Sequence, residues 1–95
     1  MSAFARALSP AIRELRILCS QSGPGSEGTR QFIQSAYPAI KKANPDLPVL
    51  IREASGTPAR FFARFEKGVE KHVELDGLSP SDVEARVAQL LKTSA

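Results

Sequence analysis

The chain contains no tryptophan, and it has only one cysteine, one histidine and one tyrosine among its 95 residues. A single cysteine cannot form a disulfide within the chain, and with the single histidine, His72, it cannot supply a zinc cluster. No apolar run approaches the roughly 18 residues that a membrane-spanning helix needs. The sequence therefore excludes a disulfide-stapled fold and a zinc module, and it indicates a protein that is soluble or peripheral to a membrane.

Motifs for nucleotide binding and for nucleophilic catalysis are also missing. The stretch GPGSEG, residues 23–28, lacks the Gly-x-Gly-x-x-Gly spacing, a Lys-Ser pair and a nearby acid for a ribose, so we interpret it as a loop. His72 lies between Glu70 and Glu74, where a solvated imidazole is favoured over a catalytic one. No Ser–His–Asp set or paired-carboxylate site is convincing. We expect no catalytic residue, no metal site and no cofactor.

What the chain does contain is the composition of one small folded domain. Apolar residues make up 42% and charged residues 24%, which favours folding over disorder. The net charge is +3, but Lys41 and Lys42 are the only adjacent basic pair. A solvated surface is therefore favoured over a phosphate-binding patch, and no nucleic-acid partner is expected.

Residues 1–12 form an N-terminal extension with a composition of its own. Up to Arg13 the chain has Arg and Ser but no acidic residue, and Phe4, Leu8 and Ile12 recur at a spacing of four. This composition resembles a mitochondrial presequence, although the segment runs directly into the first apolar strand. An uncleaved targeting segment and an ordinary extension both fit it. The folded domain is assigned to residues 13–95.

The first half of that domain has the pattern of a parallel βαβ unit. Residues 12–20 alternate as a strand, with Leu15, Ile17 and Cys19 on one side. A glycine-rich loop ends at Ser26, which is a good N-cap for a helix over about 27–43. A second apolar strand covers 49–53, and a right-handed crossover is expected.

Two prolines in this part raise separate questions. Pro38 falls inside the predicted helix, where it removes a backbone hydrogen bond, so we expect a bend there. Pro58 follows Thr57 just before the third strand, and the bond between them can be cis or trans. The sequence alone leaves the cis and trans forms of this bond equally favoured.

The second half predicts a hairpin and a final helix. Two alternating runs, 59–66 and 69–75, flank Lys67-Gly68, which is a hairpin signature. Ser79 at the N-cap, followed by Pro80 and Asp82, opens a helix that runs to about residue 92.

The resulting order is β-α-β-β-β-α: an α/β, thioredoxin-like fold with a four-stranded mixed sheet and two main helices. A full thioredoxin-like fold holds a further helix between its second and third strands. Residues 54–59 are too few to form one. One face of the sheet should therefore lack its usual cover.

Three stretches carry a resemblance to a known family: LRILCSQSGPGSEGTRQFI, KKANPDLPVLIREASG and ARFEKG. They resemble the small thioredoxin-like accessory subunits of mitochondrial respiratory complex I over roughly residues 13–92. Two mitochondrial ribosomal proteins share the domain more distantly. The resemblance implies a non-catalytic subunit that supports assembly or stability of the matrix arm. It also implies a peripheral position on the matrix side of the inner membrane, with the large iron–sulfur subunit as principal neighbour.

Cys19 is the one redox candidate. The family resemblance implies a second cysteine just after the Arg-Glu pair in many members, but this chain has Ala54 there. A monothiol mechanism with Ser22 is conceivable, yet Ser26 at the helix start lies seven residues beyond Cys19, too far for the helix dipole to lower the thiol pKa. A buried structural cysteine is favoured. A monothiol redox protein and a mitochondrial ribosomal protein remain as alternative functions.

The uncovered sheet face is the candidate docking surface. Alternation assigns Leu18, Leu50 and Phe62, or their alternates, to this face, which should then expose an apolar patch. The N-terminal segment, with Phe4 and Leu8, could cover part of it, and a partner protein the rest. Polar contacts at the rim are expected from two basic residues, Arg60 and Arg64.

Overall fold

Strand β1 (Ile12–Cys19) lies inside a four-stranded mixed sheet with the order β2-β1-β3-β4. Strand β2 (Val49–Glu53) pairs with it in parallel, and β3 (Arg60–Phe65) pairs with its other side antiparallel. Strand β4 (Glu70–Glu74) completes the hairpin with β3. This computed structural model describes residues 4 and 7–92, and the predicted β-α-β-β-β-α fold is confirmed.

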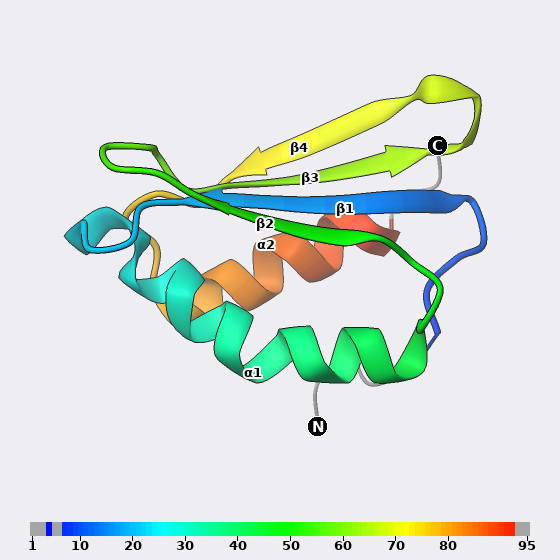
Figure 1. The fold of residues 1–95 in the computed structure, drawn as a ribbon, viewed down its shortest axis with the longest axis horizontal. Coiled ribbons are helices and arrows are strands. Elements are labelled where there is room, and N and C mark those ends of the chain that lie inside the picture. The colour runs from blue at the N-terminus through cyan, green and yellow to red at the C-terminus, as the bar shows by residue number, and fades with distance from the viewer. Residues whose placement is uncertain (1–3, 5–6, 93–95) are drawn as a thin grey trace.

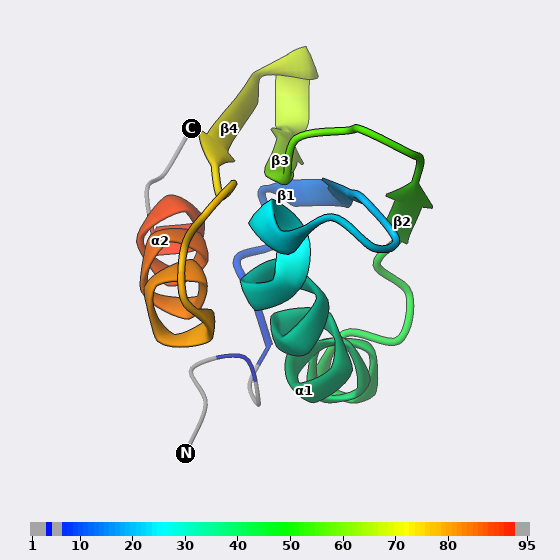
Figure 2. The ribbon, with the colours of Figure 1, turned by 90° about the vertical axis from the view of Figure 1, so that its left-hand side faces the viewer.

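Both helices, α1 (Glu27–Ala43) and α2 (Pro80–Lys92), lie on the same face of the sheet. Figure 1 shows them below the strands, and Figure 2 shows α1 and α2 side by side in one layer. No described helix covers the opposite face, as the short connection between β2 and β3 predicts.

The core fills the space between the sheet and the two helices. Alternate side chains of β1 and β3 point into it, with Ile12 joining them across a register shift before Glu14, and their exposed fractions are at most 5%. A sheet that is covered on one side needs apolar side chains on that side only. This explains why apolar and polar residues alternate along the strands. The strand residues concerned are Ile12, Leu15, Ile17, Cys19, Phe61, Ala63 and Phe65. The helices contribute Phe32, Ala36, Ile40, Val83 and Val87.

The ends of the predicted elements are largely as expected. Helix α1 spans the predicted residues and continues through Pro38, so the bend at Pro38 remains a prediction. At the start of α2, the backbone N–H of Asp82 donates to the Ser79 hydroxyl at 3.2 Å, which confirms the N-cap. The hairpin turn has positive φ at Lys67 and Gly68, as the Lys-Gly pair suggested. No peptide bond in the described chain is cis, which includes that before Pro58.

The loop after β4 crosses over the start of α1 at very close range. The N–H of Gly77 donates to the Gly25 carbonyl at 2.7 Å. A Cβ atom added at Gly28 would lie 2.1 Å from the Leu78 carbonyl oxygen, which is far inside van der Waals contact. Glycine at position 28 is therefore needed for the β4–α2 loop to pass the first turn of α1.

Replacing Gly28 with Ala should destabilise the protein, although alanine normally stabilises a helix interior relative to glycine by about 1 kcal/mol. We expect a net loss of about 1–3 kcal/mol, because the new methyl group meets backbone atoms that cannot rotate away. Urea unfolding followed by circular dichroism measures the change. Gln34→Ala, at an exposed position of the same helix, is the control and should change stability little. A Gly28→Ala protein more stable than the native chain would contradict the close contact.

Candidate functional site

Cys19 ends β1 and is fully buried in the hydrophobic core. Burial raises the pKa of its thiol above the ordinary value of 9.0, and the Glu53 carboxylate raises it further, whereas Arg30 acts in the opposite direction. The net effect favours the protonated thiol, which is a poor nucleophile. This environment is that of a structural cysteine.

The loop after Cys19 is closed by hydrogen bonds that leave the sulfur inside. The Ser26 hydroxyl accepts from the backbone N–H of Ser20 at 2.9 Å, and the Ser20 hydroxyl accepts from Gly23 N–H at 3.1 Å. The Arg30 guanidinium donates to the carbonyl oxygens of Ser20 and Gly23 at 3.0 and 2.9 Å. Arg30 therefore braces the loop backbone.

The prediction that Ser26 caps α1 with its side chain is wrong. Ser26 precedes the helix, but it is the last residue of a 3-10 turn, Pro24–Ser26, and its side chain makes no cap hydrogen bond. The hydroxyl is buried and faces back toward the end of β1, where it satisfies Ser20. The serine therefore stabilises the loop rather than the helix terminus.

A pocket of about 340 Å³ opens beside this loop, but the thiol does not reach it. Among its lining residues are Ser20, Ser22, Ser26 and Asp76, and Cys19 is not one of them. Ala54 lies next to Cys19 in space, since its N–H donates to the Cys19 carbonyl at 3.1 Å. With an alanine there, no dithiol pair can form. The structure thus gives no support to the monothiol alternative, because Ser22 and the sulfur do not share an accessible site.

The open face of the sheet carries more charge than the sequence reasoning expected. Most of the charged side chains of the strands lie there, interrupted by a few apolar ones. Register places Arg16 beside both Leu50 and Phe62, and Phe62 beside His72. We define the open face by its outward strand residues: Glu14, Arg16, Leu18, Leu50, Arg52, Arg60, Phe62, Arg64, Glu70, His72 and Glu74.

Ion pairs join most of these charges. Arg64 contacts Glu14 at 2.7 Å, and Arg60 contacts Glu74 at 2.9 Å. Arg16 pairs with Glu14 and with Glu70. The expected wide apolar patch is therefore wrong: Leu50 is the only large apolar residue of the open face with a high exposed fraction, 38%. The three glutamates of the open face offset the charge of three of its four arginines.

A stack of three side chains lies at the centre of the open face. The Arg16 guanidinium lies over the Phe62 ring, 5.0 Å from its centroid. The His72 ring stacks on Phe62 with centroids 5.2 Å apart. Arg16 and His72 were missed as members of this surface, although their parity with Phe62 could have indicated them. These two contacts hold the orientation of the Phe62 ring, which stays partly exposed on the open face.

The described N-terminal residues Phe4 and Leu8 lie on the other side of the molecule. Phe4 is 1% exposed and packs edge-on against Phe32, with ring centroids 5.3 Å apart. The N–H of Leu8 donates to the Asn44 side chain at 2.9 Å. The expectation that this segment covers the open face is therefore wrong. Phe4 and Leu8 instead contact α1 and the residue that follows it, where Phe4 can bury its ring against Phe32.

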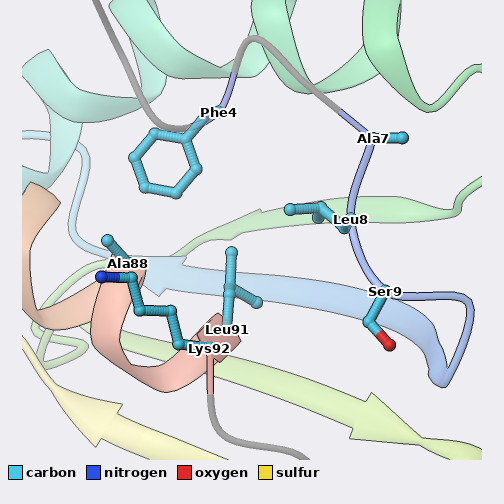
Figure 3. Close-up of a pocket in the computed structure, with 7 residues that line it drawn as sticks. All are labelled: Phe4, Ala7, Leu8, Ser9, Ala88, Leu91 and Lys92. Carbon is cyan, nitrogen blue, oxygen red and sulfur yellow. The ribbon is translucent and has the colours of Figure 1, made fainter.

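Figure 3 shows the pocket that Phe4 and residues 7–9 form with the end of α2. The pocket has a volume of about 390 Å³, and the side chains of Phe4, Leu8 and Leu91 lie around it. Lys92 lies at its edge. Among the described residues that line it, Ser9 and Lys92 are the only polar ones, so it defines no functional site by itself.

No group of three or more histidine, cysteine, aspartate or glutamate side chains in residues 4 and 7–92 has a metal-binding arrangement. A search of the same residues finds no helix with the length and apolar character needed to cross a membrane.

Comparison with known proteins identifies the class to which this fold belongs. Residues 29–80 match the family described as the mitochondrial ribosomal protein L51 / S25 / CI-B8 domain. The match includes most of α1, all of β2 and the β3–β4 hairpin, and it ends where α2 begins.

Full-length relatives narrow this class. The chain is 45% identical over 89 residues to the NADH-ubiquinone oxidoreductase 10.5 kDa subunit of Neurospora crassa, covering 94% of this chain and 95% of the relative. It is 42% identical to NADH dehydrogenase [ubiquinone] 1 alpha subcomplex subunit 2 of Arabidopsis thaliana, covering 98% and 96%. The mouse protein of that name is also 42% identical, covering 88% and 85%. The chain therefore belongs to this family of NADH dehydrogenase subunits.

Burial of Cys19 predicts a specific pH dependence of stability. In the unfolded chain the thiol ionises near its ordinary pKa of 9.0, whereas the folded protein holds the proton to a higher pH. The contribution of Cys19 to stability is therefore complete below pH 9, and it is lost as the pH rises toward the folded pKa. Urea unfolding of the native chain and of Cys19→Ala between pH 7 and 11 measures it. The native chain should lose more stability above pH 9 than the variant does.

The same burial predicts that Ellman's reagent modifies Cys19 slowly in the folded protein and rapidly in urea. Rapid modification of the folded protein at pH 7, with equal pH profiles for the native chain and Cys19→Ala, would show an accessible, ionised thiol.

Proposed function

We propose that this chain is a non-catalytic accessory subunit of mitochondrial NADH:ubiquinone oxidoreductase, respiratory complex I. The observation that carries the proposal is near-full-length identity of 42–45% to proteins that bear the names of subunits of this enzyme. The buried thiol of Cys19 agrees with a role that does not require redox chemistry by the chain itself.

Within that complex, we place the chain as a peripheral subunit on the matrix side of the inner membrane. Its principal neighbour would be the large iron–sulfur subunit, and its role would be assembly or stability of the matrix arm. Support comes from the size and design of the domain: one sheet face builds the core, and the other is free to contact a partner.

The open face is the docking surface in this proposal. Phe62 offers a flat aromatic group held between Arg16 and His72, and Arg60 and Arg64 lie beside it on the same strand. The Arg60–Glu74 pair is exposed, and Arg64 reaches the half-buried Glu14 through an exposed guanidinium. Pairs with such access to water contribute little to folding stability. They can therefore exchange partners when another protein docks, while Phe62 supplies the apolar contact at the centre.

Co-migration in native gels tests the proposed function. The full chain with a detectable tag, expressed in mitochondria, should migrate with complex I, and Cys19→Ser should migrate in the same way. Sedimentation with mitochondrial ribosomes instead would favour the ribosomal members of the domain family. A thiol-dependent reductase activity that Cys19→Ser abolishes would favour the redox alternative.

Substitution of Phe62 tests the docking surface. Phe62→Glu should lower the fraction of the chain found in complex I several-fold, because it replaces a central apolar contact with a charge. Val69→Glu is the matched control: Val69 is 40% exposed, but it lies in the hairpin turn away from the stack. Equal incorporation of both variants, at equal thermal stability, would remove the open face from the proposal.

A further inference from the structure

The two edges of the sheet differ in their protection against strand pairing. At one edge, β4 has the sequence EKHVE, in which four of five side chains are charged or titratable. At the other edge, β2 has the sequence VLIRE and begins with three apolar residues. Charged residues along an edge strand discourage the addition of another strand, and apolar runs do not. The edge formed by β2 is therefore the one that can accept a further strand.

The direction of the backbone hydrogen bonds shows which groups of β2 are free. Leu15 N–H donates to the Pro48 carbonyl at 3.0 Å, and Ala54 N–H donates to the Cys19 carbonyl at 3.1 Å. In a parallel ladder, alternate residues of a strand bond to the same neighbour. Even-numbered residues of β2 therefore bond to β1, and the N–H groups of the odd-numbered ones point outward. These outward groups belong to Val49, Ile51 and Glu53.

The side chains along this edge have a defined chemical pattern. Leu50, on the open face, is 38% exposed and is one of two large apolar side chains in the described chain with such exposure. Arg52 follows it on the open face, next to Leu18 on β1, and Glu53 points to the helix side. Both Arg52 and Glu53 are exposed, and neither forms a salt bridge within the described chain.

We propose that the outer edge of β2 binds an extended segment of a partner protein as a fifth strand of the sheet. The segment would place apolar side chains beside Val49, Leu50 and Ile51. It would place an acidic side chain beside Arg52 and, as the next residue, a basic side chain beside Glu53. The outward N–H groups of β2 supply backbone hydrogen bonds, and the two charges set the register. This proposal rests on the proposed function in that the partner is a subunit of complex I.

A second copy of this chain fits the edge poorly. Antiparallel self-pairing centred on Ile51 places Arg52 opposite Leu50 and Glu53 opposite Val49. Centring the pair on Leu50 places Arg52 opposite Pro48, which offers no acidic side chain. Centring it on Arg52 places two like charges together. None of these registers pairs both charges, whereas an acidic–basic segment of another protein does.

Photo-cross-linking in the assembled complex tests the proposal. Leu50 is replaced by benzoylphenylalanine in the full chain, and cross-linked peptides are identified in purified complex I. We expect cross-links to one extended segment with the acidic–basic pattern, together with slowed amide exchange in 49–53 relative to the free chain. Arg52→Glu should lower incorporation at least about fivefold, since it opposes like charges in the interface. Arg86→Glu, at an exposed position of α2, should leave incorporation unchanged.

The outcomes separate this proposal from the proposed function. Co-migration of the native chain with complex I, but with unchanged amide exchange in 49–53 and no cross-link from position 50, would overturn the strand addition and leave the proposed function intact. Cross-links between two copies of the chain would also overturn it. If the native chain does not migrate with complex I, the proposed function fails, and the claim that the strand belongs to a complex I subunit fails with it.

Discussion

The constraint on which the rest of this structure depends is the short connection between β2 and β3. Residues 54–59 cannot form a helix, so the chain has no element with which to cover the second face of its sheet. Both helices must then share one layer, and every large core side chain of β1 and β3 must point toward that layer. The same constraint forces the outward side chains to be compatible with water, which the ion pairs among arginine and glutamate accomplish.

The fold could be predicted to this extent because its signals are local. The limits of α1 and β2 follow from apolar periodicity and from the residues that end each element, and both agree with the structure. The inward set of strand residues was less certain, because apolar residues occur on both parities of β1 and β3. The charged residues show which set faces the solvent, because Glu14, Arg16 and Arg64 lie on the same side of the sheet as Phe62. Burying these charges would cost far more than exposing Phe62.

The positions of two features, the Phe4 and Leu8 side chains and the Ser26 hydroxyl, depend on contacts between residues that a local sequence pattern does not reveal. A four-residue spacing marks Phe4 and Leu8 as one side of a segment, but it does not say which layer the segment joins. Phe32 lies 28 positions further along the chain and offers the ring against which Phe4 packs. Ser26 resembles an N-cap in sequence, yet the turn at Pro24 brings its hydroxyl to Ser20. Long-range packing against Phe32 places Phe4, and a hydrogen bond from Ser20 draws the Ser26 hydroxyl away from the helix.

The unequal edges of the sheet connect stability with assembly. A fully apolar edge would promote non-specific pairing of the free subunit, and a fully charged edge would prevent any strand from binding. In β2, the three apolar residues supply a surface that benefits from burial, and the adjacent Arg52 and Glu53 penalise any strand that lacks the complementary charges. Specificity then comes from the penalty for a wrong partner more than from the strength of the correct contact. In the proposed assembly, one solvated face would let the subunit fold alone, and one selective edge would let it bind a single partner.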